Sequence, residues 1–392
     1  MIRSVLVACC LLVPAAALVG PTAADPIRVT VPLEELWRIG GDSEEEGEFF
    51  GVIGAIEVGA DGTVFLLDRQ LSEVKLFDAD GGYIRTIGRE GEGPGEFRRP
   101  TDLFLTPEGN VAVLQLMPGK IVALTPEGDP AGEIRLPELE GGGRRMLWQG
   151  AGSPSGIVVE SSTMTMDGRS GTRSVTIAAY SPDGGTETAR FFERSSPIDF
   201  ANMVIDERTT MRPIWTIGDD GVLWLVPVFG EYRLQMILPD GTVEREIERE
   251  YEHLVRTEEE REEARGRFVI RGPRVQPTIK VLDHHPDIRE IHARPDGGCW
   301  ALTSRGWLEP PDGAICVFDV FDSEGEFVRQ VVLQGEGDPE QDALYLTGDR
   351  LFVVTGFFDA LRAMFGGGEE EEEVEPAADL VPMEVICYRL DS

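Results

Sequence analysis

Short apolar runs, each introduced by a tight polar turn that contains glycine, recur along the whole chain. Asp-Gly and related pairs in these turns supply the positive φ that a hairpin turn requires. Six runs align on their turns, and one column of the alignment holds Phe65, Ala112, Val159, Trp224, Trp300 and Phe352. The column before it is apolar as well, so we expect strands that are buried on both faces, as in sheets stacked against sheets.

Further strands flank each of these runs. A strand precedes the turn, as in 51–58, 101–105 and 287–293, and a second hairpin follows most runs, beginning at Val74, Ile121, Val175, Arg233 and Val317. Each unit is therefore a four-stranded meander, and six units predict an all-β fold, a six-bladed β-propeller. A seven-bladed ring, in which the insertion after the fourth unit forms a blade of its own, is the alternative.

One domain accounts for residues 25–392. We expect its blades at about 51–88, 97–136, 145–192, 213–248, 287–333 and 341–392. The last unit stops after its third strand, whereas the segment 27–40 has no unit and ends like the fourth strand of the first unit. We therefore predict that 27–40 completes the sixth blade and closes the ring, which hides two strand edges.

Residues 1–24 have the features of a secretory signal peptide, namely Arg3, an apolar run from Val5 to Val19 and a small-residue cleavage site. The run is too short to span a membrane, and no other segment approaches ~18 unbroken apolar residues. We therefore expect an exported protein, periplasmic or extracellular, with no membrane span. Cys9 follows the letters of a lipoprotein box but lies too early in the apolar run, so lipidation is not expected.

Three cysteines remain after cleavage: Cys299, Cys316 and Cys387. All three lie in strand-like runs, where a free cysteine acts as a small buried hydrophobic residue. A disulfide between Cys299 and Cys316 is the alternative in an oxidising compartment.

The stretch IGREGEGPGEFRRPTDLFL from Ile87, followed by a Glu-Gly-x-Val-x-Val turn and strand, resembles an NHL repeat. The whole chain looks like the exported bacterial six-bladed propellers related to that family. The match is clearest over 51–136, although the second unit has Gln115 where the first has Asp68. The resemblance implies the fold and leaves the activity open, because most such domains bind partners while relatives include lactonases, streptogramin-type lyases and amidating lyases.

Acidic residues dominate the charge, with 36 Lys plus Arg against 71 Asp plus Glu and a formal net charge of −35. This excess argues against nucleic acid or an anionic membrane surface as a partner. Much of it falls in an insertion at 249–286 and in a run at 366–380, which we interpret as a disordered loop. Within the insertion, Thr257 and Glu260 have the spacing of a capping box and predict a short helix.

The long insertions all fall on one face of the predicted ring. The turns of the opposite face are short, whereas the loop-rich face carries 162–173, 193–212, 250–286, 304–314 and 356–382. Since loops carry function while the scaffold holds them, we expect this face of a monomer to bind a protein, peptide or glycan partner without catalysis. The candidate ligand-binding residues, arginines for carboxylates and a tryptophan for stacking, are Arg89, Arg98, Arg99, Arg305 and Trp307.

The four histidines lie within one stretch of forty residues, from His253 to His292. The enzymes among the related propellers draw metal ligands from several blades, so we predict no cofactor and no metal centre. His284, His285 and His292 are nevertheless the candidates for a divalent cation. The alternative function is a metal-dependent lactonase- or lyase-type enzyme with its ion at the central funnel.

Overall fold

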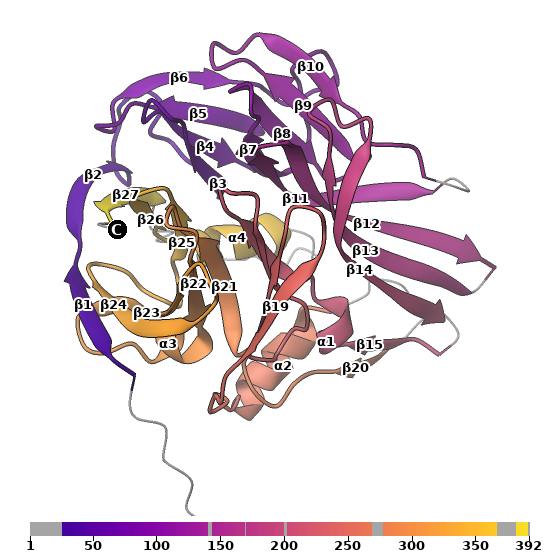
Figure 1. Cartoon of the computed structure of the whole chain (residues 1–392). Helices are drawn as coiled ribbons and strands as arrows, with labels where there is room; N and C mark the ends of the chain where they lie inside the picture. The colour runs from indigo at the N-terminus through magenta and orange to yellow at the C-terminus, as the bar shows by residue number, and fades with distance from the viewer. Residues whose placement is uncertain are drawn as a thin grey trace, which may run out of the picture.

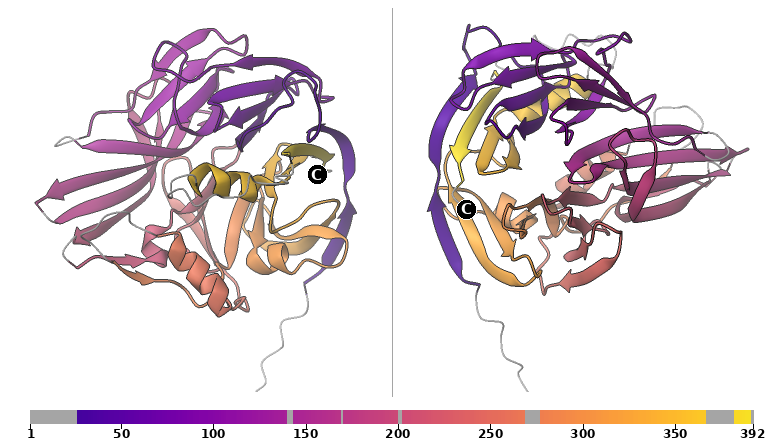
Figure 2. Two further views of the ribbon diagram at one scale, coloured as in Figure 1. Left: turned by 180° about the vertical axis from the view of Figure 1, so that it is seen from behind. Right: turned by 45° about the horizontal axis from the view of Figure 1, so that its top comes forward.

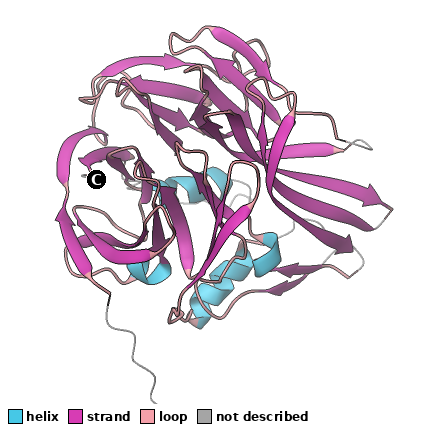
Figure 3. Ribbon diagram, in the orientation of Figure 1, coloured by secondary structure: helices cyan, strands magenta, loops and turns pink. Residues whose placement is uncertain are grey.

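The computed structural model describes residues 26–139, 143–168, 170–199, 202–268, 277–366 and 382–390. In these residues, six sheets of at least four strands each are arranged as blades around a central axis (Figures 1 and 3). The predicted six-bladed propeller is confirmed, and the seven-bladed alternative is wrong. The predicted signal peptide 1–24 and residues 367–380 of the acidic run lie outside the described residues.

Each blade is a meander of consecutive antiparallel strands. The first blade comprises β3 (Ile53–Val58), β4 (Val64–Asp68), β5 (Glu73–Phe77) and β6 (Tyr83–Ile87). The second comprises β7 (Pro100–Leu105), β8 (Val111–Gln115), β9 (Lys120–Leu124) and β10 (Pro130–Ile134). The third comprises β11 (Arg144–Ser153), β12 (Gly156–Asp167), β13 (Ser170–Tyr180) and β14 (Glu187–Asp199).

The second half of the ring repeats this order with one exception in the last blade. The fourth blade comprises β16 (Ile214–Ile217), β17 (Leu223–Val226), β18 (Arg233–Ile237) and β19 (Val243–Glu248). The fifth comprises β21 (Ile288–Ala293), β22 (Cys299–Thr303), β23 (Ala314–Phe321) and β24 (Phe327–Gln334). The sixth comprises β25 (Ala343–Thr347), β26 (Arg350–Val354) and β27 (Glu384–Arg389), and takes its fourth strand from the N-terminal part of the chain.

The N-terminal segment closes the ring, but it serves two blades rather than one. β2 (Glu34–Gly40) pairs antiparallel with β27 and completes the sixth blade as predicted. β1 (Arg28–Pro32) instead pairs in parallel with β24, as the outermost strand of the fifth blade. The prediction that all of 27–40 joins the sixth blade is therefore corrected for β1. Figure 2 shows this segment following the outside of both blades.

The core consists of six hydrophobic clusters, one at each junction between neighbouring blades in the described residues. Adjacent residues of a strand face opposite junctions, so Val64 contacts the sixth blade and Phe65 contacts the second. The alignment of the third blade is wrong by one residue, because Val158, and not Val159, faces the next blade. Its turn is shorter, with Ser153 paired to Gly156, and a shift of one residue exchanges the two faces of a strand.

The loop-rich face is confirmed, but several of the predicted loops have regular structure. All four helices of the described residues lie on this face: α1 (Glu207–Thr210), α2 (Glu258–Gly266), α3 (Ser304–Leu308) and α4 (Phe357–Gly366). The predicted loop 162–173 is instead the extended end of the β12–β13 hairpin. A short parallel pair, β15 (Val204–Asp206) with β20 (Thr278–Lys280), joins the two insertions that flank the fourth blade. α2 has the predicted capping box between Thr257 and Glu260.

Two further features bear on the sequence predictions. Cys299, Cys316 and Cys387 are buried and free, as expected for small hydrophobic residues. Among the described residues, no helix has the length and apolar character needed to cross a membrane.

Asp68 anchors the first blade at the entrance of its inner strand. Its buried carboxylate accepts hydrogen bonds from the backbone N–H groups of Gly51 at 2.7 Å, Val52 at 3.2 Å, Gln70 at 3.0 Å and Leu71 at 2.9 Å. Gln115 occupies the corresponding place in the second blade, where its Oε1 accepts from the N–H of Arg98 at 2.9 Å. The two blades therefore use different side chains for the same purpose: each accepts a backbone hydrogen bond at the start of the inner strand.

Replacing Asp68 by alanine should destabilise the protein by about 3 kcal/mol, because several buried N–H groups lose their acceptor. Urea-induced unfolding measures this change. The control is Asp61→Ala, which removes an acceptor from the exposed turn at Thr63 and should cost under about 1 kcal/mol. Equal destabilisation by both variants would contradict the anchoring role of Asp68.

Candidate functional site

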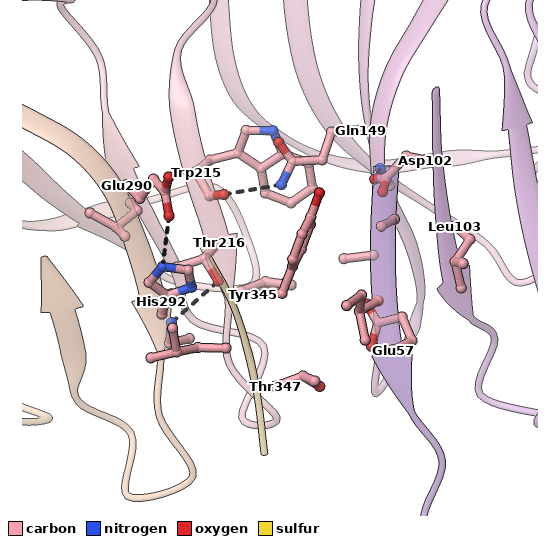
Figure 4. A pocket seen from close by; sticks show the side chains of 18 of the residues that line it. Glu57, Asp102, Leu103, Gln149, Trp215, Thr216, Glu290, His292, Tyr345 and Thr347 are labelled. Carbon is pink, nitrogen blue, oxygen red and sulfur yellow. Dashed lines mark hydrogen bonds and ion pairs between the residues drawn. The ribbon is translucent and has the colours of Figure 1, made fainter. Parts of the chain in front are cut away.

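A central channel runs between the innermost strands of the six blades. Its cavity has a volume of about 1080 Å³ and is lined by residues of β3, β7, β11, β16, β21 and β25. Figure 4 shows side chains from several blades converging on it. At the loop-rich face, Phe357 and Phe358 of α4 and Trp307 of α3 also line the cavity, so these helices partly cover this end.

The innermost strands carry β-bulges at corresponding positions. The register shifts at Gly54 in β3, Thr101 in β7, Trp148 in β11 and Arg289 in β21. In β3, β7 and β21 the bulge is at the second residue of the strand, near the loop-rich side, whereas in β11 it is at mid-strand, and all four residues line the channel. Bulges redirect side chains and are frequent beside functional sites. The bulges therefore bring one residue of each of these four blades to the channel wall, and three of the four carry a side chain there.

Hydrogen bonds between blades surround the channel. The inner strands of neighbouring blades converge but do not pair through their backbones. Instead, each of these hydrogen bonds joins a side chain of one blade to the backbone of the next. They are Arg69 Nε to Pro100 O at 3.2 Å, Gly150 N to Asp102 Oδ2 at 2.9 Å, Gln149 Nε2 to Trp215 O at 3.2 Å, Ala293 N to Thr216 Oγ1 at 3.3 Å, and Tyr345 OH to Ile53 O at 3.1 Å. Five of the six junctions are connected in this way.

Two carboxyl groups in the channel have strongly raised pKa values. Burial raises the pKa of Glu57 to about 8, and the negative charge of Asp102 on the neighbouring blade adds to the effect. Burial also raises the pKa of Asp102 to about 7, although the N–H of Gly150 and the charges of Arg212 and Arg69 oppose the shift. Figure 4 shows Glu57 and Asp102 on the two adjacent inner strands. Such pairs of perturbed acids are typical of functional sites.

Arg69 and Arg212 approach Asp102 from the loop-rich side. Arg69 uses its Nε to hold the carbonyl oxygen of Pro100, and within the described residues no carboxylate lies within ion-pair distance of its guanidinium. Burial lowers the pKa of Arg69, and the positive charge of Arg212 lowers it further. Two cations therefore lie in one region of the channel, and Arg69 has no ion-pair partner among the described residues.

Gly54 makes the position of Arg69 possible. A Cβ atom at residue 54 would lie 1.8 Å from Cδ and 2.3 Å from Cγ of Arg69. The backbone of Gly54 is not in the left-handed region, so the reason for glycine is space and not conformation. The side chain of Arg69 therefore lies flat across β3 and reaches the channel.

Arg212 is oriented by a buried carboxylate. Glu160 on β12 is fully buried, and its Oε2 accepts from Arg212 at 3.1 Å and from the indole N–H of Trp215 at 3.1 Å. The guanidinium of Arg212 also lies 5.2 Å from the centre of the Trp148 ring. Glu160 holds only one N–H group of Arg212, and the described residues offer no acceptor for the others. They are therefore available on the channel side.

The opposite side of the channel has a different character. His292 Nε2 lies 3.4 Å from Glu290 Oε2, and the guanidinium of Arg289 lies 5.7 Å from the ring of Trp307. The indole N–H of Trp307 is buried and has no hydrogen-bond partner in the described residues. Tyr345 projects between the two sides in Figure 4. This side of the channel thus combines aromatic rings with polar groups.

The predicted ligand-binding residues do not converge on one site. Arg89 pairs with Glu96 and Arg98 pairs with Glu92, both at the crossover between the first two blades. Arg99, in a left-handed conformation with φ of 48°, also lies on this crossover. Arg305 donates to the carbonyl oxygens of Glu252 and His253, so it fastens the insertion to α3. Of the five, Trp307 lines the channel.

The three histidines named as metal candidates also separate. His285 contacts Glu260 of α2 at 3.1 Å, and His292 lies in the channel. His284 instead approaches His253 and Asp287, and these three form the group of metal-ligating side chains found in the described residues. This group is not among the residues that line the channel.

Sequence reasoning missed Arg69, Arg212, Glu57 and Asp102. One signal was available, because Glu57 and Asp102 are acidic residues inside inner strands that are otherwise mostly apolar. Arg69 and Arg212 gave none, since nothing in the sequence distinguishes them from the many arginines that pair with surface glutamates.

Comparisons with known proteins support the fold. Residues 46–140 match a family model described as DUF5128, 6-bladed beta-propeller. No curated protein matches the chain. A solved member of the DUF4221 family from Bacteroides vulgatus ATCC 8482 is similar, with a TM-score of 0.50 and 9% identity over 91% of this chain and 97% of that chain.

Two further solved structures are less similar in shape. A protein of Bacteroides fragilis NCTC 9343 named as exported has a TM-score of 0.48 and 10% identity, over 93% of this chain and 100% of that chain. Virginiamycin B lyase from Staphylococcus aureus has a TM-score of 0.41 and 12% identity, over 91% and 99%. At such identities a shared fold does not carry function. The resemblance to NHL repeats stays a prediction.

The raised pKa of Glu57 predicts a pH dependence of stability. The unfolded chain releases this proton near pH 4.5, whereas the folded protein keeps it up to about pH 8. The group therefore stabilises the fold at low pH, and this contribution is lost as the pH rises through about 8. The melting temperature should fall between pH 5 and pH 8.5, and Glu57→Gln should reduce that fall.

The control for this measurement is Glu259→Gln, at an exposed position of α2. It should leave the pH profile of the wild type unchanged. An identical slope in wild type and Glu57→Gln would contradict the assignment.

Proposed function

We propose that the protein is an exported binding module that takes an anionic group of a peptide or glycan partner into the loop-face mouth of its central channel. The observation that carries the proposal is the convergence on the channel of Arg69, which has no ion-pair partner among the described residues, and Arg212, which Glu160 holds through one nitrogen only. In a chain of net charge −35, a partly buried arginine without an ion-pair partner, such as Arg69, is costly unless a ligand compensates its charge.

Charge and hydrogen-bond geometry both favour a carboxylate as the recognised group. A guanidinium donates in a planar fork that matches carboxylate oxygens, and such charge-assisted bonds are the strong ones. Arg69 is held through its Nε and Arg212 through one terminal nitrogen, so each keeps donors for a ligand. Mutual repulsion of the two cations, which contributes to the lowered pKa of Arg69, would be relieved by a bound anion.

Aromatic groups around the channel mouth support the proposal that the partner is a peptide or a glycan. Trp148 lies under Arg212, Trp307 lies under Arg289, and Tyr345 projects between the two sides. Aromatic rings give sugar faces and apolar side chains a stacking surface. The features of residues 1–24 support export, which would expose the site to such partners in the periplasm or outside the cell.

The proposal predicts that binding of an anionic probe depends on both arginines. A panel of uronic-acid oligosaccharides and peptides with a free C-terminal carboxylate is screened by thermal shift, and hits are measured by calorimetry. Arg69→Ala and Arg212→Ala should each weaken the best probe at least tenfold, which is about 1.4 kcal/mol. Arg135→Ala, at an exposed arginine outside the channel, is the matched control.

Two results would refute this proposal. One is equal affinity for the probe and for its amide or ester analogue, in which the negative charge is removed. The other is unchanged affinity in both channel variants.

A substitution at Gly54 tests whether the position of the Arg69 guanidinium matters, separately from its charge. Gly54→Ala keeps the guanidinium but places a Cβ atom where the side chain of Arg69 lies, so the arginine must move. Probe affinity should fall about as much as in Arg69→Ala while the melting temperature changes little. Gly266→Ala in α2, where a Cβ atom meets nothing within 4 Å, is the control. Full affinity in Gly54→Ala would mean that the location of Arg69 does not matter.

The alternative is a hydrolase or lyase of the lactonase type with a metal ion at the funnel. The observation that favours the enzymatic activity, though not the metal ion, is the pair of raised pKa values at Glu57 and Asp102, since a carboxylic acid that titrates near neutrality can act as a general acid or base. Turnover of a lactone panel that is lost in Glu57→Gln, with probe binding retained, would favour this alternative over pure binding.

A further inference from the structure

We propose that His253, His284 and Asp287 form a binding site for one divalent transition-metal ion of the zinc type, separate from the channel. The three residues come from both ends of the insertion between β19 and β21. One ligand-capable atom from each lies within 4.8 Å of the others. Two of the four histidines of the whole chain thus meet at one carboxylate.

The distances are close to those of a metal site. His253 Nδ1 lies 2.6 Å from Asp287 Oδ1, and His284 Nδ1 lies 3.9 Å from the same oxygen. Ligand atoms of a tetrahedral zinc site, with bonds of ~2.0–2.1 Å, are about 3.3 Å apart. Rotation of the imidazole rings, whose terminal torsion is broad, would bring the ligand atoms from these separations to that spacing.

The backbone around the cluster is already fixed. The segment of His253 and the segment of His284 are joined by hydrogen bonds from Arg256 N to Asp283 O at 2.8 Å and from His285 N to Leu254 O at 2.8 Å. Arg305 holds the carbonyl oxygens of Glu252 and His253. The ligands would therefore lose little conformational freedom on binding an ion, which favours affinity.

The chemistry of the donor set fits zinc better than calcium. Imidazole nitrogens suit zinc and its neighbours in the transition series, whereas calcium takes oxygen ligands. Three protein ligands leave at least one position for water. His284 Nδ1 also lies 2.7 Å from the carbonyl oxygen of His285, so the ring would bind an ion either through Nε2, with this contact kept, or through Nδ1 once the contact opens.

Burial and access are both suitable. The side chain of Asp287 is 2% exposed, and that of His284 is 9% exposed, so the ion would face little competition from water on this side. The side chain of His253 is 54% exposed and gives an entry path. The two imidazoles are stacked with centroids 4.1 Å apart, so one ring must turn to direct its nitrogen at a shared ion, and the exposed side chain of His253 has room to do so.

A metal at this place would join the insertion to the fifth blade. Asp287 directly precedes β21, and its backbone carbonyl accepts from Ser304 at the start of α3, the helix that carries Trp307. The ion would act on the fold of the loop-rich face and take no part in chemistry in the channel. Its presence is independent of the proposed ligand at Arg69 and Arg212.

The test is metal titration of the full chain after removal of metals with a chelator. Zn²⁺ is measured by calorimetry and Co²⁺ by its visible absorption, which reports imidazole coordination in a low-symmetry site. We expect one equivalent to bind and to raise the melting temperature. His253→Ala, chosen because the side chain is half exposed, and Asp287→Asn should each weaken Zn²⁺ binding at least tenfold.

Matched controls separate this site from other cation binding. His285→Ala removes a neighbouring imidazole that faces Glu260 and should leave the Zn²⁺ affinity unchanged. Ca²⁺ titration measures binding to the acidic runs, and Arg69→Ala should retain the metal even if it loses the anionic probe. Unchanged Zn²⁺ affinity in His253→Ala, or no Zn²⁺ binding beyond that seen with Ca²⁺, would overturn the proposal.

Discussion

The pairing of β2 with β27 is the contact on which the rest of the structure depends. Six sheets can enclose an axis only if the last blade is complete, and this blade has three strands until the N-terminal segment joins it. β1 continues onto the fifth blade and so links it to the sixth, at the junction that lacks, among the described residues, a hydrogen bond of the kind that joins the other blades around the channel. The side chain of Trp37 in β2 donates to Ala79 O of the first blade, so the same segment contacts both sides of the closure.

The channel is a consequence of that closure. Inner strands converge without backbone pairing, so their polar groups must be satisfied by side chains of the next blade, and this places Asp102, Gln149, Thr216 and Tyr345 around the axis. A carboxylate confined there loses solvation, which accounts for the raised pKa of Asp102. The groups that hold the ring together are thus also the ones that give the channel its chemistry.

The fold was largely predictable, because its signals are local. The Gly-containing turns and the strands apolar on both faces are visible in each unit, and the missing fourth strand of the last unit pointed to β2. Two details of the third blade could not be predicted from local sequence signals. The third blade has a shorter turn, so alignment on Gly156 shifted its strand by one residue. The ends of β12 and β13 lack an apolar face to bury, and they form strands because they pair with each other.

The sequence by itself determined the repeat, the closure, the loop-rich face and the burial of the three cysteines, since each depends on spacing along the chain or on hydrophobic pattern. Only the tertiary structure decided which polar residues meet. Arg69 reaches the channel because Gly54 leaves room for it, Arg212 is turned inward by Glu160, and His253 meets Asp287 across an insertion. Charged side chains carry no signature of their partners in the sequence, because their positions depend on contacts between residues far apart in the chain.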